Sequence, residues 1–342
     1  MSIFNVRKSM AMLAATTLLA SSVMTMPAFA ENDKITVGAL RFTSHAASFI
    51  AFERNYFADA GLDVEFEFFQ AAQPMAVAIA SGDIDYAVTA VSGGLINLAE
   101  KGAIKVIGGA LSEEAGIDGQ KILVSDKAFQ AGIKSPADLD GATWGISQSG
   151  SSFHYMGAKI AAAENIELTY KPLQKVGAII GALKSGQIDA WSIVPHIAKP
   201  LAASGAVHII GDVSDYVQDY QVTTVFTSTK NATDNREQTE RFLKAFSQGA
   251  DDYAAAMIDK TGGDAGVDEM VELIHKYVYT DRELEKAAPS IINGTMRINS
   301  GAALNIASIE DQLKWFQAEG LIDSDIQLDT LIDTSYVELL GK

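Results

Sequence analysis

The chain has 342 residues, with 43 Asp and Glu against 26 Lys and Arg, a net charge of −17 and no cysteine. This charge balance argues against nucleic acid and anionic membrane surfaces as partners. The lack of cysteine excludes disulfides, a thiol nucleophile and thiolate metal ligands.

The first segment has the pattern of a secretory signal peptide over residues 1–30. Arg7 and Lys8 precede an apolar run, and Ala28-Phe29-Ala30 forms a cleavage site that contains no cysteine for a lipid anchor. Its removal takes away two basic residues and leaves a net charge of −19. We expect a mature protein in the periplasm without stable membrane insertion, long enough for two domains.

Repeated strand, polar turn and helix units follow the signal peptide. Apolar strands are expected at 34–40, 64–68 and 86–91, with polar turns at 41–45, 70–73 and 92–94, and with helices over 49–61, from 74 and after 94. Such units build a mostly parallel sheet by right-handed crossovers. Ligands of such sheets bind at the carboxyl ends of the strands, where these turns lie.

A small-polar turn at 147–152 has the features of an anion cradle. It joins a strand ending at Ile146 to an alanine-rich helix over 153–165. Backbone N–H groups and the positive end of a helix dipole meet at this point, Gly150 allows close approach, and serines add hydroxyls. An ordinary serine helix cap is the alternative.

The same pattern occurs a second time later in the chain. Residues 78–86 (AIASGDIDY) are echoed by residues 182–190 (ALKSGQIDA), which favours two similar lobes. β-Branched runs at 121–127 and 222–229 are expected to cross between them. We therefore place lobe 1 at 31–120 and 223–342, lobe 2 at 121–222, and an amphipathic helical tail, from Asn235 onward, on lobe 1.

Taken in order, these segments resemble the type II periplasmic binding proteins of ABC importers, in the family that serves nitrate, taurine, aliphatic sulfonates and thiamine-pyrimidine precursors. The matching residues are a helix over 49–62 ending in Gly61-Leu62, then 81–85 (SGDID), 137–141 (ADLDG), 150–152 (GSS) and 186–191 (GQIDAW). The resemblance implies an α/β fold of two lobes, each a mostly parallel sheet flanked by helices. Two crossing strands would act as a hinge that closes over a small molecule, before docking on a membrane permease.

Two departures from the family pattern bear on the ligand. Val194 stands where relatives often carry an aromatic or acidic residue before a proline, which weakens an amino-sulfonate interpretation. Arg41 and His45 are not general family features and could mark a distinct ligand subgroup.

The candidate site is formed by the polar turns of both lobes. We expect its ligand-binding residues to be Arg41, Thr43, Ser44, His45, Gln70, Gln73, Thr89, Ser92, Gln148, Ser149, Gly150, Ser151, Ser152, His154, Trp191 and Pro195.

Several of these residues have a second interpretation. Arg41 could be a surface arginine, and Trp191 and Phe42 could be core aromatics instead of walls for a ring. His45, His154 and His196 could share a metal, but hydrogen-bonding histidines are favoured, because neither spacing nor a carboxylate partner supports a ligand set. Protonated His154 could also help to hold an anion.

We expect a monomeric binding protein for a small organic anion, such as a sulfonate or aromatic carboxylate, without cofactor, metal or catalysis. A neutral heterocycle such as a pyrimidine precursor, or an enzyme on the same fold, is the alternative. A regulator's effector-sensing domain is disfavoured by the signal peptide and the charge, whereas presentation of the ligand to a membrane sensor stays open.

Overall fold

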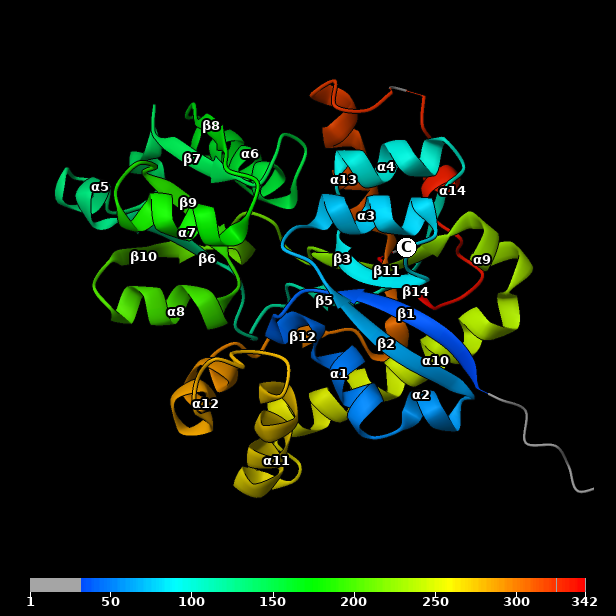
Figure 1. Cartoon of the computed structure of the whole chain (residues 1–342). Coiled ribbons are helices and arrows are strands. Elements are labelled where there is room, and N and C mark those ends of the chain that lie inside the picture. The colour runs from blue at the N-terminus through cyan, green and yellow to red at the C-terminus, as the bar shows by residue number, and fades with distance from the viewer. Residues whose placement is uncertain (1–31, 324, 342) are drawn as a thin grey trace, which may run out of the picture. The chain divides into compact units, whose positions relative to one another are not determined.

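The computed structural model describes residues 32–323 and 325–341, so the predicted signal peptide lies outside the described residues. These residues belong to one compact unit that begins at Asn32. Two five-stranded sheets form its framework, and helices flank both of them (Figure 1).

The first sheet has the order β2-β1-β3-β11-β4. Its strands are β1 (Asp33–Ala39), β2 (Leu62–Phe68), β3 (Tyr86–Ala90), β4 (Ile104–Gly109) and β11 (Thr223–Ser228). β1 is parallel to β2 and β3, whereas β11 is antiparallel to β3 and to β4. The sheet is mixed, with β11 as the one strand that runs against the other four.

The second sheet repeats this plan with the order β10-β6-β9-β7-β8. Its strands are β6 (Lys121–Ser125), β7 (Thr143–Ile146), β8 (Thr169–Pro172), β9 (Ala190–Ile193) and β10 (Val207–Asp212). β7 is parallel to β8 and β9, and β6 is antiparallel to β9 and β10. β6 is therefore the reversed strand of this sheet.

The two reversed strands coincide with the segments that we expected to cross between lobes. The chain passes from the first sheet to the second between β5 (Leu111–Ser112) and β6, and returns between β10 and β11. The α/β fold class is confirmed. The lobe boundaries at residues 120/121 and 222/223 stay a prediction, because the structure groups both sheets in one compact unit.

The helices and short strands complete the framework. The first sheet is joined to α1 (Ala46–Glu53), α2 (Tyr56–Asp59), α3 (Ala72–Ser81), α4 (Gly93–Glu100) and α9 (Thr229–Asp234), and the second to α5 (Asp126–Gln130), α6 (Ser152–Glu164), α7 (Val176–Lys184) and α8 (Pro195–Ala203). The tail contains α10 (Arg236–Tyr253), α11 (Gly263–His275), α12 (Leu284–Ile292), α13 (Ile306–Ala318) and α14 (Leu328–Leu331). Two-stranded pairs join β5 to β12 (Arg297–Ile298) and β13 (Leu304–Asn305) to β14 (Leu339–Leu340).

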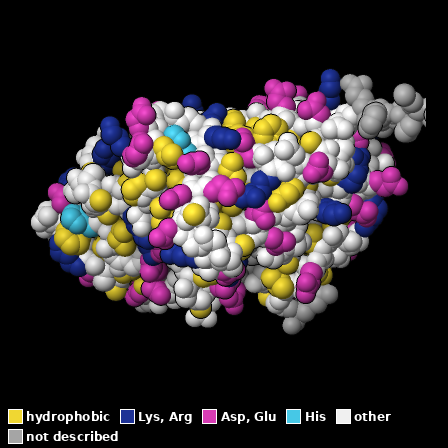
Figure 2. Space-filling model, turned by 90° about the horizontal axis from the view of Figure 1, so that it is seen from below, with side chains coloured by type: hydrophobic (Ala, Val, Ile, Leu, Met, Phe, Trp, Pro, Cys, Tyr) yellow, Lys and Arg dark blue, Asp and Glu magenta, His cyan; other side chains and the backbone are white. Residues whose placement is uncertain are grey.

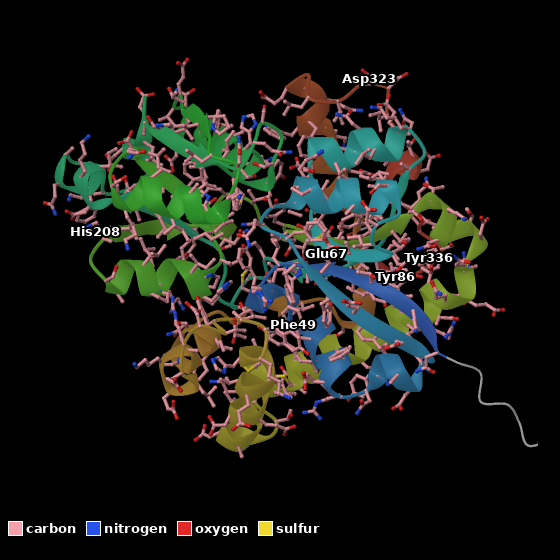
Figure 3. All side chains as sticks on the ribbon, in the orientation of Figure 1. Phe49, Glu67, Tyr86, His208, Asp323 and Tyr336 are labelled. Carbon is pink, nitrogen blue, oxygen red and sulfur yellow. The ribbon has the colours of Figure 1, made fainter. Side chains whose placement is uncertain are left out.

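The longest helix of the tail, α10, packs on the first sheet, as expected, whereas α12 contacts α8 of the second sheet. Phe242 of α10 stacks on Tyr86 of β3 with ring centroids 4.2 Å apart, and on Phe57 at 5.3 Å. Tyr86 and Phe49 are both marked in Figure 3, and Phe49 of α1 stacks on Tyr277 at 4.5 Å. One expected helix, over 49–61, is divided in two, because Asn55 takes a left-handed conformation (φ 60°) between α1 and α2.

The aspartates of the two Ile-Asp repeats make equivalent hydrogen bonds, one in each sheet. Asp85 Oδ2 accepts the backbone N–H of Thr36 in β1 at 2.8 Å, and Asp189 Oδ2 accepts that of Thr143 in β7 at 2.8 Å. Each carboxylate thus binds the backbone of the neighbouring strand, in the middle of β1 and at the start of β7. This shared use of the repeat supports an internal duplication.

A pair of glycines matches in the same way. A Cβ placed on Gly38 would lie 2.6 Å from Ile84 Cδ1, and one placed on Gly145 would lie 2.5 Å from Ile188 Cδ1. In both sheets the isoleucine of the repeat fills the space that a glycine on the adjacent strand leaves open.

Candidate functional site

The turn after β1 brings a buried histidine to the end of the strand. His45 ends a short 3-10 helix over Thr43–His45 and is 1% exposed. Its Nδ1 accepts the backbone N–H of Leu40 over a long 3.5 Å, and its Nε2 has no hydrogen-bond partner. Burial lowers the pKa of His45 to about 3, so the ring is neutral and carries its proton on Nε2.

A second histidine, His196 of α8, forms a contact between the two sheets. His196 Nδ1 lies 2.9 Å from Thr43 Oγ1, which donates to the carbonyl of Gly294 at 3.2 Å. The Thr43 hydroxyl therefore accepts from His196 and donates to Gly294. Burial, followed by the neighbouring His45, lowers the pKa of His196 to about 3.

The predicted cradle at the start of α6 is formed partly by backbone. Gly150 has φ +74°, a left-handed conformation that favours glycine, and its carbonyl accepts the N–H of Gly93 from α4 at 2.9 Å. Ser151 is 4% exposed and precedes the first residue of α6, but its hydroxyl makes no cap and has no partner.

His154 supports this turn from within the helix. Its Nδ1 accepts the N–H of Gly150 at 3.2 Å, and its ring meets Tyr170 and Trp315 edge-on at 4.2 and 5.1 Å. Burial lowers the pKa of His154, although Glu319 acts in the opposite direction. The ring is therefore used as an acceptor for the turn, and protonation would remove that bond.

These turns enclose a cavity of about 60 Å³ between the two sheets. One water needs roughly 10–15 Å³ on the same scale, so there is room for a small organic group. The cavity is lined by Leu40, Phe42, Ser44, His45, Ala71, Ala72, Thr89, Ala90, Leu111, Gln120, Ser147, Ser151, Ser152, Phe153, Val176, Ile193, Val194, Val222 and Thr223. These residues include no Asp, Glu, Lys or Arg.

Helix N-termini surround this cavity. Ala72, Ser152 and Val176 begin α3, α6 and α7, and Val194 immediately precedes α8. None of the four helices has a side-chain cap, whereas Ser92 caps α4 through the N–H of Leu95. The first-turn N–H groups and the helix dipoles give the cavity a positive potential without a charged side chain.

Five of the sequence-predicted site residues line the cavity, namely Ser44, His45, Thr89, Ser151 and Ser152. The lining does not include Arg41, Thr43, Gln70, Gln73, Ser92, Gln148, Ser149, Gly150, His154, Trp191 or Pro195.

Local partners explain why several predicted residues lie off the cavity. The Arg41 guanidinium lies 3.7 Å from the centroid of the Phe68 ring, and Nη1 donates to the Tyr277 carbonyl at 3.1 Å. Gln148 donates to Gln73 at 3.2 Å.

Other predicted residues are either exposed or part of the packed interior. Gln70 and Ser149 are exposed. Trp191 is fully buried, with its ring edge-on to Phe153 at 5.3 Å, and Pro195 is buried as the first residue of α8.

Sequence reasoning missed Gln120 and Thr223, which also line the cavity. Gln120 directly precedes β6 and Thr223 begins β11, the two reversed strands. Because these strands run against their neighbours, their amino ends meet the carboxyl ends of the others. The crossing segments in the sequence were a usable signal for both residues.

The cavity residue Gln120 is hydrogen-bonded to a buried carboxyl group, that of Glu113. Glu113 is 2% exposed, and its Oε1 accepts the backbone N–H and the Nε2 of Gln120 at 3.0 and 3.2 Å. Glu113 Oε2 has no partner. Burial raises the pKa of Glu113 to about 7, despite these hydrogen bonds and the positive charge of Lys121.

The three histidines that the sequence could have assigned to a shared metal do not lie together in the structure. Phe42 touches both His45 and His196, with ring centroids 6.4 and 5.2 Å apart, whereas His154 packs on Tyr170. Over residues 32–323 and 325–341, no three His, Cys, Asp or Glu side chains gather so as to hold a metal ion.

Two mixed sheets flanked by helices, with a cavity at their strand ends, define the periplasmic binding protein fold. The chain belongs to the NMT1/THI5-like family, whose profile matches residues 42–256. Comparison with curated proteins gives no match.

Solved structures are similar over most of the chain. The alkanesulfonate-binding protein SsuA from Xanthomonas axonopodis pv. citri, bound to MOPS, is 16% identical with a TM-score of 0.68, over 89% of this chain and 99% of that one. The nitrate-binding protein NrtA from Synechocystis PCC 6803 is 14% identical with a TM-score of 0.64, over 88% and 84%. A cysteine-to-serine mutant of DszB, in complex with biphenyl-2-sulfinic acid, is 14% identical with a TM-score of 0.55, over 89% and 97%. At these identities the likeness shows the fold alone.

Proposed function

We propose that this protein is the periplasmic substrate-binding component of an ABC importer. It captures a small organic anion, of the sulfonate or aromatic carboxylate type, between two lobes and delivers it to a membrane permease. Family membership and the structural likeness to sulfonate- and nitrate-binding proteins support transport rather than catalysis. Within the described residues, no helix is long and apolar enough to cross a bilayer.

The proposal that the ligand is an anion rests on one observation. Two buried polar atoms without partners, His45 Nε2 and Ser151 Oγ, come from opposite sheets and belong to residues that line one cavity. A buried polar group is normally hydrogen-bonded, so both atoms have capacity for a ligand. An anion accepts from both, and the uncapped helix N-termini favour its charge.

The surroundings make the cavity selective for such a solute. Acidic side chains are spread over the surface seen in Figure 2, and the whole chain carries −17, yet the cavity lining contains no carboxylate. Phe42 and Phe153 supply apolar walls for a ring. The local field, rather than the net charge, would therefore decide what binds.

A neutral heterocycle is the second candidate, favoured by the lack of Lys and Arg in the lining. A ring nitrogen or carbonyl accepts from His45 Nε2 as an anion does, without needing a counter-charge. The two candidates differ in how ionisation of the ligand changes its affinity.

Calorimetric titration with benzoate, benzenesulfonate, taurine and an uncharged aminopyrimidine tests the proposal. We expect one aromatic anion to bind with micromolar or better affinity, about −8 kcal/mol. Binding of the aminopyrimidine alone would select the neutral ligand, and no binding by any probe would count against both candidates.

A matched pair of serines tests the site itself. S151A removes the unpartnered hydroxyl and should weaken binding about tenfold, the usual worth of one hydrogen bond to a charged group. S149A changes an exposed serine of the same turn and should leave the affinity unchanged. Equal effects of the two variants would refute the placement of the ligand against Ser151.

The location and assembly have their own tests. A mature protein that begins at Glu31 by mass spectrometry, recovered from the periplasmic fraction, would support export by residues 1–30. Sedimentation at micromolar concentration should give a monomer. A chain that retains Met1 would refute the cleavage.

A further inference from the structure

Outside the cavity, α6 and α13 form another contact between the two sheets. α6 follows β7 of the second sheet, whereas α13 packs on the first sheet through Ile309, Leu313 and Phe316, which join a buried cluster with Met75 of α3. The Trp315 ring of α13 meets Tyr155 of α6 edge-on at 5.4 Å.

Asp311 is the polar centre of this contact. Its carboxylate accepts the Tyr155 hydroxyl in a short hydrogen bond, and Lys159 Nζ lies 3.0 Å from Oδ2 and 3.2 Å from Oδ1. Partial burial acts to raise the pKa of Asp311, but the bonds from Tyr155 and Lys159 together lower it below its usual value. Both donors thus stabilise the ionised carboxylate.

The position of these donors ties the contact to the cavity. Tyr155 follows Ser151 by four residues, about one turn of α6, and Lys159 follows by a second turn. Tyr155 is 1% exposed, whereas the side chains of Lys159 and Asp311 are 30% and 49% exposed. Asp311 therefore holds the same helix whose N-terminus lines the cavity, without lining the cavity itself.

We propose that Asp311, through Tyr155 and Lys159, is a positioning residue that latches α6 to α13 and so holds the two lobes closed over the ligand. The inference rests on the proposed binding function. The latch bonds join helices of different sheets, so a movement that separates α6 from α13 would break them. An interaction made in the closed form alone shifts the population toward that form and slows ligand release.

The first experiment measures closure without any ligand. The chain contains no cysteine, so A163C on α6 and A318C on α13, both exposed, provide two sites for spin labels. We expect one dominant distance in the parent protein and an added population at longer distance after Asp311→Asn. Tyr155→Phe, which keeps the ring, should act in the same direction.

The neighbouring residue provides the matched control. Glu310 pairs with Lys314 of the same helix at 3.9 Å, so Glu310→Gln removes an equal charge without touching α6. It should leave the distance distribution unchanged. An unchanged distribution in Asp311→Asn, or equal changes in both variants, would overturn the latch.

The second experiment links the latch to binding, with benzoate and benzenesulfonate as probes. Asp311→Asn should raise the dissociation constant about tenfold, mainly through a faster dissociation rate, and Glu310→Gln should not. If neither probe binds the parent protein, the anion proposal fails while the distance measurement still decides the latch. An unchanged dissociation rate despite a wider distance distribution would overturn the role of the latch in ligand retention.

Discussion

Replacing the buried carboxyl of Glu113 with an amide should make the protein more stable at alkaline pH and leave its stability nearly unchanged in acid. Glu113→Gln keeps an oxygen that can accept both N–H groups of Gln120. It replaces Oε2, which has no partner, with an uncharged amino group. The variant therefore removes a desolvated charge while it preserves the packing.

The sign and the size follow from the pKa of Glu113. The group has a pKa of about 7 when folded, against 4.5 for an ordinary glutamate. Between these values the folded chain binds more protons than the unfolded chain, so the free energy of unfolding falls as pH rises. A shift of roughly 2.5 pKa units corresponds to about 3 kcal/mol of unfolding free energy. The buried charge of Glu113 destabilises the parent protein by this amount above pH 7, and the destabilisation is absent below pH 4.5.

Urea unfolding at pH 5 and pH 8 measures this difference. Glu113→Gln should gain about 2–3 kcal/mol over the parent on going from pH 5 to pH 8. Glu114→Gln is the control, because Glu114 is the next residue along the chain and its half-buried carboxylate pairs with Arg297. The same pH-dependent gain in both variants, or none in Glu113→Gln, would refute burial as the cause.

Two further predictions concern the internal repeat. Asp85→Asn and Asp189→Asn should each cost about 1 kcal/mol of unfolding free energy, because each weakens a charge-assisted bond to a neighbouring strand, and their effects should add in the double variant. Clearly unequal losses of unfolding free energy in the two single variants would contradict equivalent roles for Asp85 and Asp189. Gly145→Ala should cost about 1–3 kcal/mol, because its Cβ would lie 2.5 Å from Ile188 Cδ1, whereas Gly181→Ala in α7 meets nothing within 4 Å and should gain up to about 1 kcal/mol. Thermal unfolding measures both variants, and an equal change in stability in the two would contradict the close contact between Gly145 and Ile188.

Much of the fold could be predicted from local patterns. Apolar runs followed by polar turns indicated most strands of the two sheets, and the Ile-Asp repeat predicted that the sheets are similar. The break at Asn55 could not be predicted, because a left-handed asparagine depends on how α1 and α2 pack on α10. Pattern identifies elements, whereas tertiary contacts set where they end.

The site was less predictable, because a polar residue at a strand end has several possible partners. Ser92 and Ser151 look alike in the sequence, yet Ser92 caps α4 while the Ser151 hydroxyl has no partner. Arg41 pairs with the carbonyl of Tyr277, which is 236 residues away in the chain. Which group stays available to a ligand is decided by such distant partners, which one sequence does not display.

The place of β11 also affects the order in which the chain can fold during synthesis. A nascent chain that ends before Thr223 already contains every strand of the second sheet, β6 to β10. It lacks the strand that separates β3 from β4, so β4 has no neighbour with which to complete the amino-terminal sheet. The first sheet, whose first four strands are translated before the second sheet, can therefore be completed only after β11 has been synthesised.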